Sequence, residues 1–368
     1  MMMAGKKAQV LALVTTLVAL GAAGCGAGSG VTAGPTPNAG SEFVFVPDAA
    51  DNVLDVIVID PSGAFNSGPT PFVATGTEPV WAAVTPNNQF IYVTNLVSNS
   101  VSAYTLNTTN GAIGAVSGSP FAAGTAPGAV AVDSSGRYVY VLNNNSDNIS
   151  GYSIGSGGTL AAVPGSPFLT GITSQSQGIL ATAGFVYVAN FGSSNVGAYS
   201  INSSNGTLTQ LGSSPYATGS GPVALAMDPA GKFLFTGNSS SNNISAFTVN
   251  GDGSLTAVPG SPFSAGNSPQ YVVTDRTGAF LYVVNVNDNT VEAFTIGSSG
   301  ALSVINLYPT GVGPEGLAVD AANKFLMVAN CTSGSMSVYS LNGNGTLNSL
   351  GALSLGLNSC PQAVATTH

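Results

Sequence analysis

The six residues FIYVTN, at positions 90–95, recur along this chain with small changes. They are rich in aromatic and β-branched residues and end in asparagine, a composition typical of a short buried strand that runs into a turn. Five more copies start at intervals of 45 to 48 residues: YVYVLN (138–143), FVYVAN (185–190), FLFTGN (233–238), FLYVVN (280–285) and FLMVAN (325–330). A period of this length is typical of a repeat architecture in which each copy marks one structural unit.

The residues around each copy predict four short antiparallel strands per unit, which we name A to D in chain order. Strand B is the repeated six-residue sequence, here called the repeated word. In five units a proline eleven residues earlier opens strand A, whereas the fourth unit has Ser176 in that place. Strand C begins six residues after the final asparagine, and strand D is expected around GSPF or SSPY, at 118–121, 165–168, 213–216 and 260–263. No stretch after residue 25 has convincing helical spacing, so the chain is predicted to be all-β.

Four-stranded units of this length predict the blades of a β-propeller, because a single blade has two apolar faces that only neighbouring blades can bury. The ends of the chain give the number of blades. FVFVPD (43–48) is a seventh strand B that no strand A precedes, and PQAVATT (361–367) is a strand A that no strand B follows. We therefore predict one seven-bladed domain over residues 42–368, closed by the C-terminal strand, which completes the N-terminal blade.

The first 25 residues predict export from the cytoplasm. Lys6 and Lys7 precede the apolar stretch 10–20, which is too short for a permanent membrane helix, and AAGC (22–25) follows it. AAGC resembles the lipobox of bacterial lipoproteins, although Ala22 stands where that motif usually has leucine. The resemblance implies that Cys25 carries a lipid, which would anchor the protein in the periplasm or outer membrane of the cell envelope. Residues 26–41, rich in Gly, Pro and Thr, predict a flexible tether.

The charges of the chain are few and unevenly placed. Without residues 1–25 the protein has four Lys and Arg against 15 Asp and Glu, a net charge close to −11, which argues against nucleic-acid binding. All four cations fall in predicted A–B turns: Arg137, Lys232, Arg276 and Lys324. The A–B and C–D turns share one face of the ring, here called the base face. The opposite face, here called the mouth face, carries the B–C and D–A connections and is predicted to have no cation.

The residue after each strand-A opening position is predicted to border the central channel at the mouth face. Four of these residues are polar: Gln177, Gln270, Glu315 and Gln362. Tyr271 directly follows Gln270, and Trp81 follows Val80, which holds the same position in another repeat. Two interpretations remain open: the amides satisfy backbone groups of the loops, or they form a polar ring that holds a neutral ligand with the aromatic residues. Trp81 also suits simple packing at the rim.

The YVTN-type words, the proline-led strands and the GSPF segments resemble the lactonase family of seven-bladed β-propellers over roughly residues 43–367. That family includes the YVTN-repeat proteins, bacterial 6-phosphogluconolactonase and a fungal muconate-lactonizing enzyme. The resemblance implies a possible ring-opening hydrolysis of a sugar lactone at the mouth face. Members with this activity typically have a Pro-Arg-His word opening a strand A, whereas the corresponding words here are PVW, PGA, PVA, PQY, PEG and PQA. The single histidine, His368, is the last residue and is expected to be frayed.

Three functions therefore stay open. The first is a binding platform at the mouth face, for a neutral small molecule or an envelope protein or carbohydrate. The second is a lactone hydrolase that prefers a neutral sugar lactone, because a phosphate would need a nearby cation. In that case Glu315, and after it Glu78, are the candidate general bases, although each also fits a solvated loop carboxylate. The third is a structural or adhesive envelope protein.

No cofactor or metal is predicted. The Asn- and Asp-rich turns at 143–148 and 285–289 offer oxygen ligands of the kind that Ca²⁺ uses, but turn geometry itself favours the same residues. GYSIG (151–155) matches a hydrolase pattern, yet its serine falls within a predicted strand and lacks an internal histidine partner.

The two cysteines that remain after Cys25 fall near each other on the predicted mouth face. Cys331 starts the B–C connection of the last blade, and Cys360 directly precedes the C-terminal strand. Because an exported protein folds in an oxidising compartment, we predict a Cys331–Cys360 disulfide. The alternative is a pair of free, small core residues.

Overall fold

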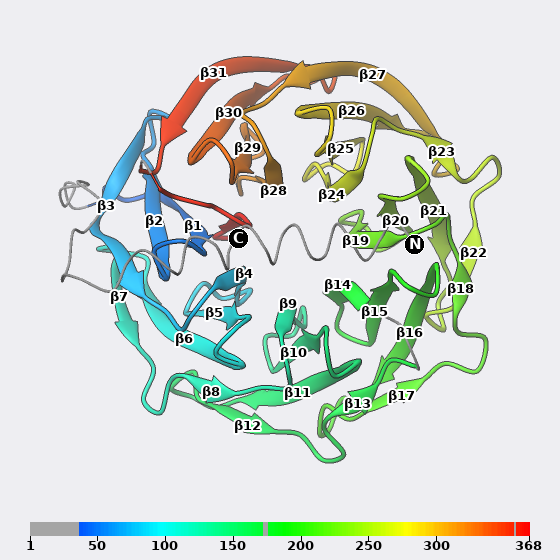
Figure 1. Cartoon of the computed structure of the whole chain (residues 1–368), viewed down its shortest axis with the longest axis horizontal. Helices are drawn as coiled ribbons and strands as arrows, with labels where there is room; N and C mark the ends of the chain where they lie inside the picture. The colour runs from blue at the N-terminus through cyan, green and yellow to red at the C-terminus, as the bar shows by residue number, and fades with distance from the viewer. Residues whose placement is uncertain (1–36, 172–175, 357) are drawn as a thin grey trace, which may run out of the picture. The chain divides into compact units, whose positions relative to one another are not determined.

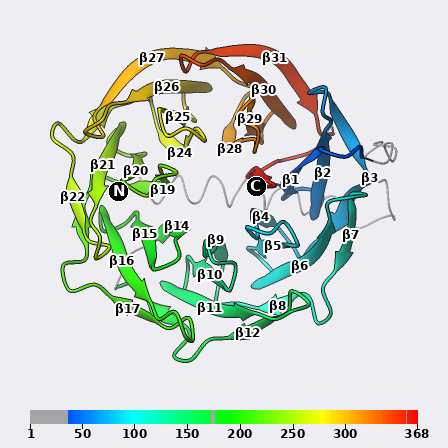
Figure 2. The ribbon, with the colours of Figure 1, turned by 180° about the vertical axis from the view of Figure 1, so that it is seen from behind.

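The computed structural model describes residues 37–171, 176–356 and 358–368. In this part the regular elements are all β-strands, which form seven antiparallel sheets arranged in a ring (Figures 1 and 2). Within these ranges the chain forms no helix that is long and apolar enough to span a membrane. The predicted seven-bladed propeller is confirmed. Its blades are numbered 1 to 7 from the N-terminus.

In blades 2 to 7 the two inner strands begin close to the predicted positions, whereas strand A of blade 1, predicted over 361–367, is a strand only at Ala365–Thr366, with an isolated bridge between Pro361 and Asp48. The A strands, which line the channel, are β4 (Pro79–Val84), β9 (Pro127–Val132), β14 (Ser176–Ala181), β19 (Pro222–Met227), β24 (Pro269–Thr274), β28 (Pro314–Val319) and β32 (Ala365–Thr366). The B strands are β1 (Glu42–Asp48), β5 (Phe90–Asn95), β10 (Tyr138–Asn143), β15 (Phe185–Asn190), β20 (Phe233–Asn238), β25 (Phe280–Asn285) and β29 (Phe325–Asn330).

The C strands follow, and the outer D strands differ among the blades. The C strands are β2 (Val53–Ile59), β6 (Ser100–Asn107), β11 (Asn148–Ile154), β16 (Asn195–Ile201), β21 (Asn243–Val249), β26 (Thr290–Ile296) and β30 (Ser335–Leu341). In blades 1, 6 and 7 strand D is continuous, as β3 (Phe65–Ala74), β27 (Leu302–Pro309) and β31 (Leu347–Ser354).

Strand D was expected around the GSPF and SSPY segments, but in blades 2 to 5 it consists of two short pieces on either side of the Ser-Pro. The pieces are β7 (Ala112–Ala115) and β8 (Phe121–Ala122), β12 (Leu160–Ala162) and β13 (Phe168–Leu169), β17 (Leu208–Gln210) and β18 (Tyr216–Ala217), and β22 (Leu255–Ala257) and β23 (Phe263–Ser264). At each break the serine hydroxyl accepts a hydrogen bond from a strand-C backbone N–H, as from Ala103 to Ser119 at 2.8 Å. The repeated serine therefore substitutes for a missing backbone acceptor.

The asparagine that ends each B strand is a buried structural residue. Asn95 is fully buried, its side-chain Nδ2 donates to Ser102 of strand C, and its Oδ1 accepts from the Gly76 N–H of the preceding loop. Asn143 makes the same pair of bonds to strand C and to the D–A connection. In Asn238, Asn285 and Asn330 the Nδ2 bond to strand C remains, whereas Oδ1 has no partner among the described residues. Blade 1 has Asp48 in this place. Its carboxylate accepts a hydrogen bond from the Cys360 N–H, in the C-terminal residues 359–368 that close the ring, here called the closing segment.

Neighbouring blades are joined by a buried core and by tyrosine hydroxyls. In blades 2, 3, 4 and 6 the third residue of the B strand is a tyrosine that is buried between blades, and its hydroxyl donates to a glycine carbonyl in the C–D turn of the next blade. Examples are Tyr140 to Gly206, at 2.8 Å, and Tyr187 to Gly253, at 2.9 Å. Blades 2, 3, 4 and 6 are therefore each fixed to the next blade by a specific hydrogen bond as well as by apolar burial, whereas blades 1, 5 and 7 have Phe45, Phe235 and Met327 at this position.

The ring closes where the C-terminal segment pairs with β1. Residues Ala365 and Thr366 of β32 lie opposite Phe45 and Val44, and the Thr367 N–H donates to the Phe43 carbonyl at 3.0 Å. The expectation that His368 is frayed is wrong. Its backbone exchanges two hydrogen bonds with the Asn88 side chain, at 2.9 and 3.0 Å, and its ring nitrogen Nε2 lies 3.2 Å from the Val84 carbonyl oxygen.

Candidate functional site

A cavity of about 200 Å³ opens at the mouth face, and all seven blades contribute to its lining. We call it the mouth cavity. Its residues are Val80, Trp81, Leu96, Gly128, Ala129, Asn144, Gln177, Val223, Gln270, Tyr271, Glu315 and Gln362. The seven residues that follow the strand-A opening positions are all among them, so the structure brings the predicted ring together.

A β-bulge explains why these residues point into the channel. In blades 2, 4, 5, 6 and 7 the pairing of strands A and B skips one residue directly after the opening position. In blade 7, for example, Pro314 and Gly316 pair with strand B, and Glu315 between them does not. A bulge redirects the side chain of its extra residue. The sequence showed the position of these residues but gave no signal for the bulge.

Glu315 is the one carboxylate among the residues that line the mouth cavity. Burial raises the pKa of its carboxyl to about 7. In the described part of the chain no group hydrogen-bonds to this carboxyl. The lack of a side chain at Gly316 lets the backbone of the closing segment approach strand A next to Glu315, because a Cβ there would lie 2.6 Å from the Cα of Ala363. Glu315 therefore changes protonation near neutral pH inside a cavity.

The amide groups of the mouth cavity are largely unused by the fold. Among the described residues, the side chains of Gln177 and Gln270 make no hydrogen bond, and Asn144 Oδ1 is buried without a partner. Gln362 Nε2 lies 2.9 Å from Cys360 Sγ and 3.6 Å from Cys331 Sγ. Among the described residues, none of the three glutamine side chains bonds a loop backbone group.

Two aromatic residues meet within the same cavity. The rings of Trp81 and Tyr271 are stacked, with centroids 5.1 Å apart and planes 26° from parallel. Burial, and after it the charge of Glu315, raise the pKa of the Tyr271 hydroxyl well above its ordinary value. The aromatic pair and the carboxyl group of Glu315 are therefore parts of one site.

Cys331 and Cys360 form a disulfide bond beside the mouth cavity, with their Cα atoms 3.9 Å apart. The bond links the B–C connection of blade 7 to the closing segment. Asp48 holds the same segment from blade 1, since its carboxylate accepts hydrogen bonds from Ser359 Oγ and from the Cys360 N–H. The contact between Gln362 and the two sulfur atoms places a cavity-lining amide directly on this covalent link.

One predicted site residue, Glu78, lies outside the mouth cavity. It occupies a turn with φ of +58°, where its backbone N–H donates to Asn52 Oδ1 at 2.7 Å. Partial burial raises the pKa of its carboxyl. Cys25, the expected lipidation site, lies outside the described residues.

The cations occupy the A–B turns of the base face, as the sequence indicated. The guanidinium of Arg276 donates to the carbonyl oxygens of Val319 and Asp320, at 3.1 and 3.2 Å, and to Thr366 Oγ1 at 3.4 Å. Lys232 Nζ donates to the Ser298 carbonyl at 2.9 Å. Among the described residues, no lysine or arginine lines the mouth cavity.

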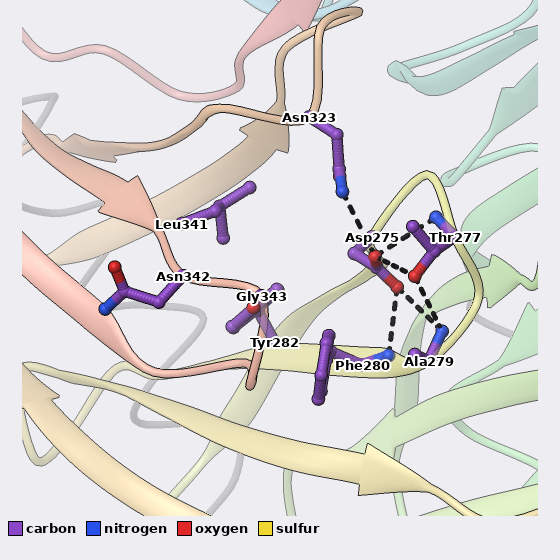
Figure 3. A pocket seen from close by; sticks show the side chains of 9 residues that line it. All are labelled: Asp275, Thr277, Ala279, Phe280, Tyr282, Asn323, Leu341, Asn342 and Gly343. Atoms are coloured by element: carbon purple, nitrogen blue, oxygen red, sulfur yellow. Dashed lines mark hydrogen bonds between the residues drawn. The ribbon is translucent and has the colours of Figure 1, made fainter.

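A second cavity, of about 170 Å³, lies at the base face between blades 6 and 7 (Figure 3). Its one carboxylate, Asp275, accepts hydrogen bonds from the backbone N–H groups of Thr277, Ala279 and Phe280 and from Asn323 Nδ2 (Figure 3). The fold already satisfies this carboxylate. Among the described residues no cluster of three or more His, Cys, Asp or Glu side chains suits a metal ion.

Comparison with known proteins identifies the family. A family model described as "Lactonase, 7-bladed beta-propeller" matches residues 36–172, 64–261 and 252–358. The chain belongs to this lactonase family. No curated protein sequence matches it.

Solved structures share the fold of this lactonase-family propeller. One is a Bacteroides uniformis protein described as a 6-phosphogluconolactonase, with 18% identity, a TM-score of 0.78, and coverage of 89% of this chain and 99% of that chain. Another is a periplasmic gluconolactonase of Pseudomonas aeruginosa, with 18% identity, a TM-score of 0.74 and the same coverage. At this identity the likeness concerns the fold.

Proposed function

We propose that the mouth cavity binds a small uncharged molecule. The observation that carries the proposal is the convergence of unpartnered amides, a carboxyl group and an aromatic pair on one cavity. Buried polar groups are normally hydrogen-bonded, yet Asn144 Oδ1 is buried without a partner among the described residues, and the half-buried side chains of Gln177 and Gln270 also lack a partner there. A ligand with hydroxyl and carbonyl groups would supply the missing partners.

The charge of the site selects against anionic ligands. In the ranges that the structure describes, the cations lie in base-face turns and none of them lines the mouth cavity. A phosphorylated compound carries two negative charges, and its recognition ordinarily uses arginine or lysine. We therefore expect a neutral sugar lactone to bind more tightly than its phosphorylated form.

Calorimetric titration of the purified propeller with glucono-1,5-lactone tests this function. We expect saturable binding that the Gln270→Ala substitution weakens. Gln89→Ala, in a base-face turn, is the matched control and should leave binding unchanged. The absence of saturable binding would contradict the proposal and favour a structural or adhesive role.

A second candidate function is hydrolysis of an uncharged lactone, and the raised pKa of Glu315 favours it. A carboxyl group with a pKa of about 7 is half ionised at neutral pH, as a general base requires. Its carboxylate would take a proton from water as the water oxygen bonds to the lactone carbonyl carbon. The ring C–O bond then breaks, and the proton passes to the ring oxygen, giving a hydroxy acid.

The hydrolysis rate, corrected for the spontaneous reaction, tests this candidate. We expect the rate to rise with pH through about 7, as the Glu315 carboxyl loses its proton. Glu315→Gln should abolish the enzymatic rate, whereas the matched Glu78→Gln variant should retain it. Equal activity in the wild-type protein and the Glu315→Gln variant would exclude Glu315 as the base.

We also propose that the protein is exported and anchored through Cys25. The proposal is supported by the basic and apolar segments of residues 1–25 and by the small residues before the cysteine. Cys25→Ser should move the protein from the membrane fraction to the soluble fraction. Unchanged fractionation would contradict a lipid anchor at this residue.

A further inference from the structure

The aromatic pair of the mouth cavity spans the channel. Trp81 belongs to β4 of blade 2, and Tyr271 belongs to β24 of blade 6. Blades 1 and 7 separate these two blades on one side of the ring, and blades 3, 4 and 5 separate them on the other. Two side chains that start from distant blades and stack at 5.1 Å must meet inside the channel.

Each ring is also held against the wall of the channel. Trp81 packs on a buried cluster that includes Ala129 and Ile179, of blades 3 and 4. Tyr271 packs on a cluster that includes Leu317, of blade 7. Both side chains nevertheless remain partly exposed and line the mouth cavity. The pair therefore presents a supported aromatic surface to whatever enters the cavity.

The groups around this surface are hydrogen-bonding and mostly uncharged. Gln177, Gln270 and Gln362 come from three different blades, and Asn144 adds a buried carbonyl oxygen that lacks a partner. Aromatic faces bind the apolar face of a ring, while amides bind hydroxyl and carbonyl groups at its edge.

We propose that the Trp81–Tyr271 pair is a stacking platform for an uncharged cyclic ligand with one apolar face and a hydrogen-bonding edge. This inference rests on the proposed function and narrows it from any small neutral molecule to a ring. A cationic ligand is the main competitor, because an aromatic pair next to a carboxylate also attracts cations. The amides favour the neutral ring, because they can hydrogen-bond to its hydroxyl groups. They would not increase the affinity for a cation that has no hydrogen-bonding groups.

The chain provides its own reporter, because Trp81 is its single tryptophan. The probes are 1,5-anhydroglucitol, an uncharged ring; glucitol, its open-chain counterpart; and choline, a cation. We expect 1,5-anhydroglucitol to change the Trp81 emission saturably and to bind about tenfold more tightly than glucitol, the order of effect that one aromatic contact supplies. Choline should leave the emission unchanged.

Two substitutions separate the platform from the rest of the site. Tyr271→Leu should weaken binding of 1,5-anhydroglucitol about tenfold, measured by calorimetry, whereas Tyr271→Phe, which keeps the ring, should retain it. Unfolding curves of both variants show whether the propeller stays intact. Equal affinity for glucitol, tighter binding of choline, or no effect of Tyr271→Leu would overturn the platform.

The outcomes also separate this inference from the proposed function. If Gln270→Ala weakens binding of glucono-1,5-lactone while Tyr271→Leu does not, the mouth cavity is a ligand site and the platform is wrong. If no uncharged probe binds the wild-type protein, both are wrong.

Discussion

The two faces of the propeller use their polar side chains in different ways. At the base face Arg276 and Asp275 are engaged by backbone carbonyl or N–H groups, and His368 is held by Asn88. At the mouth face the side chains of Gln177, Gln270 and Glu315 converge on a cavity and make no hydrogen bond within the described part of the chain. The same ring of blades therefore contains polar groups that stabilise the fold and polar groups that the fold leaves available.

This difference separates structure from function within one repeat. A polar residue that the fold satisfies should lower stability when it is removed. A polar residue that the fold leaves unpaired should cost little stability when removed, or even increase it, while binding is lost.

Truncation at the base end of the closing segment should have the largest effect. Removing residues 365–368 eliminates the pairing with β1, the contacts of Thr367 with Phe43, and the contacts of His368 with Asn88. At about 1 kcal/mol per hydrogen bond, we expect a loss of about 4 kcal/mol in the free energy of unfolding. Denaturant unfolding measures it, and an unchanged midpoint would show that the base face does not hold the ring closed.

The disulfide is a mouth-face contact that we expect to stabilise the fold. It joins residues 29 positions apart, and the chain-entropy model predicts about 3–4 kcal/mol for such a loop. Reduction should therefore lower the melting temperature. A Cys331→Ser/Cys360→Ser variant should melt at the lower temperature both with and without the reductant. If reduction of the disulfide leaves the melting temperature of the wild type unchanged, the bond contributes nothing to stability.

Glu315→Gln should increase stability at neutral and alkaline pH. The folded-state pKa of Glu315, about 7, lies above its ordinary value of 4.5, so the wild type loses stability as pH rises from about 4.5 to about 7. The variant avoids this loss. We expect no difference at pH 4 and a gain of up to about 3 kcal/mol at pH 8, from about 1.4 kcal/mol per pKa unit. Melting curves at both pH values measure it, and destabilisation at pH 8 would contradict the contrast between the faces.

Arg276→Met and Gln270→Leu form a matched pair across the two faces. Loss of the Arg276 hydrogen bonds should cost about 1 kcal/mol, because the side chain is exposed at the surface and solvent replaces part of the interaction. Gln270→Leu should leave the free energy of unfolding unchanged within about 0.5 kcal/mol. The reverse order of the two effects would mean that Gln270 is a structural residue.

Much of the fold could be predicted from sequence because its signals are local. The word in strand B, the opening proline and the buried asparagine each report a short-range requirement, and together they gave the blades and the ring closure. The same periodicity located the seven residues around the mouth cavity. Strand D was the exception, because the Ser-Pro segments interrupt it in blades 2 to 5 and the serine hydroxyl replaces a backbone acceptor.

The chemistry of the site depends on contacts that no local pattern encodes. Trp81 and Tyr271 are 190 positions apart, and their stacking depends on the width of the channel. The pKa of Glu315 depends on its burial within the assembled ring, and Glu78 lies in a turn instead of the cavity. His368, expected to be frayed, is held because the closing segment brings it to Asn88.

The most direct test of the contrast between the faces is an NMR titration of protein labelled at the glutamine side-chain nitrogens. Gln177, Gln270 and Gln362 line the mouth cavity, whereas Gln89 lies in a base-face turn and Gln210 lies in the outer strand β17. On addition of glucono-1,5-lactone, we predict saturable shifts of the three mouth-cavity signals and unchanged signals from Gln89 and Gln210. Shifts at Gln89, or none at the three mouth-cavity glutamines, would contradict the assignment of the mouth cavity as the ligand site.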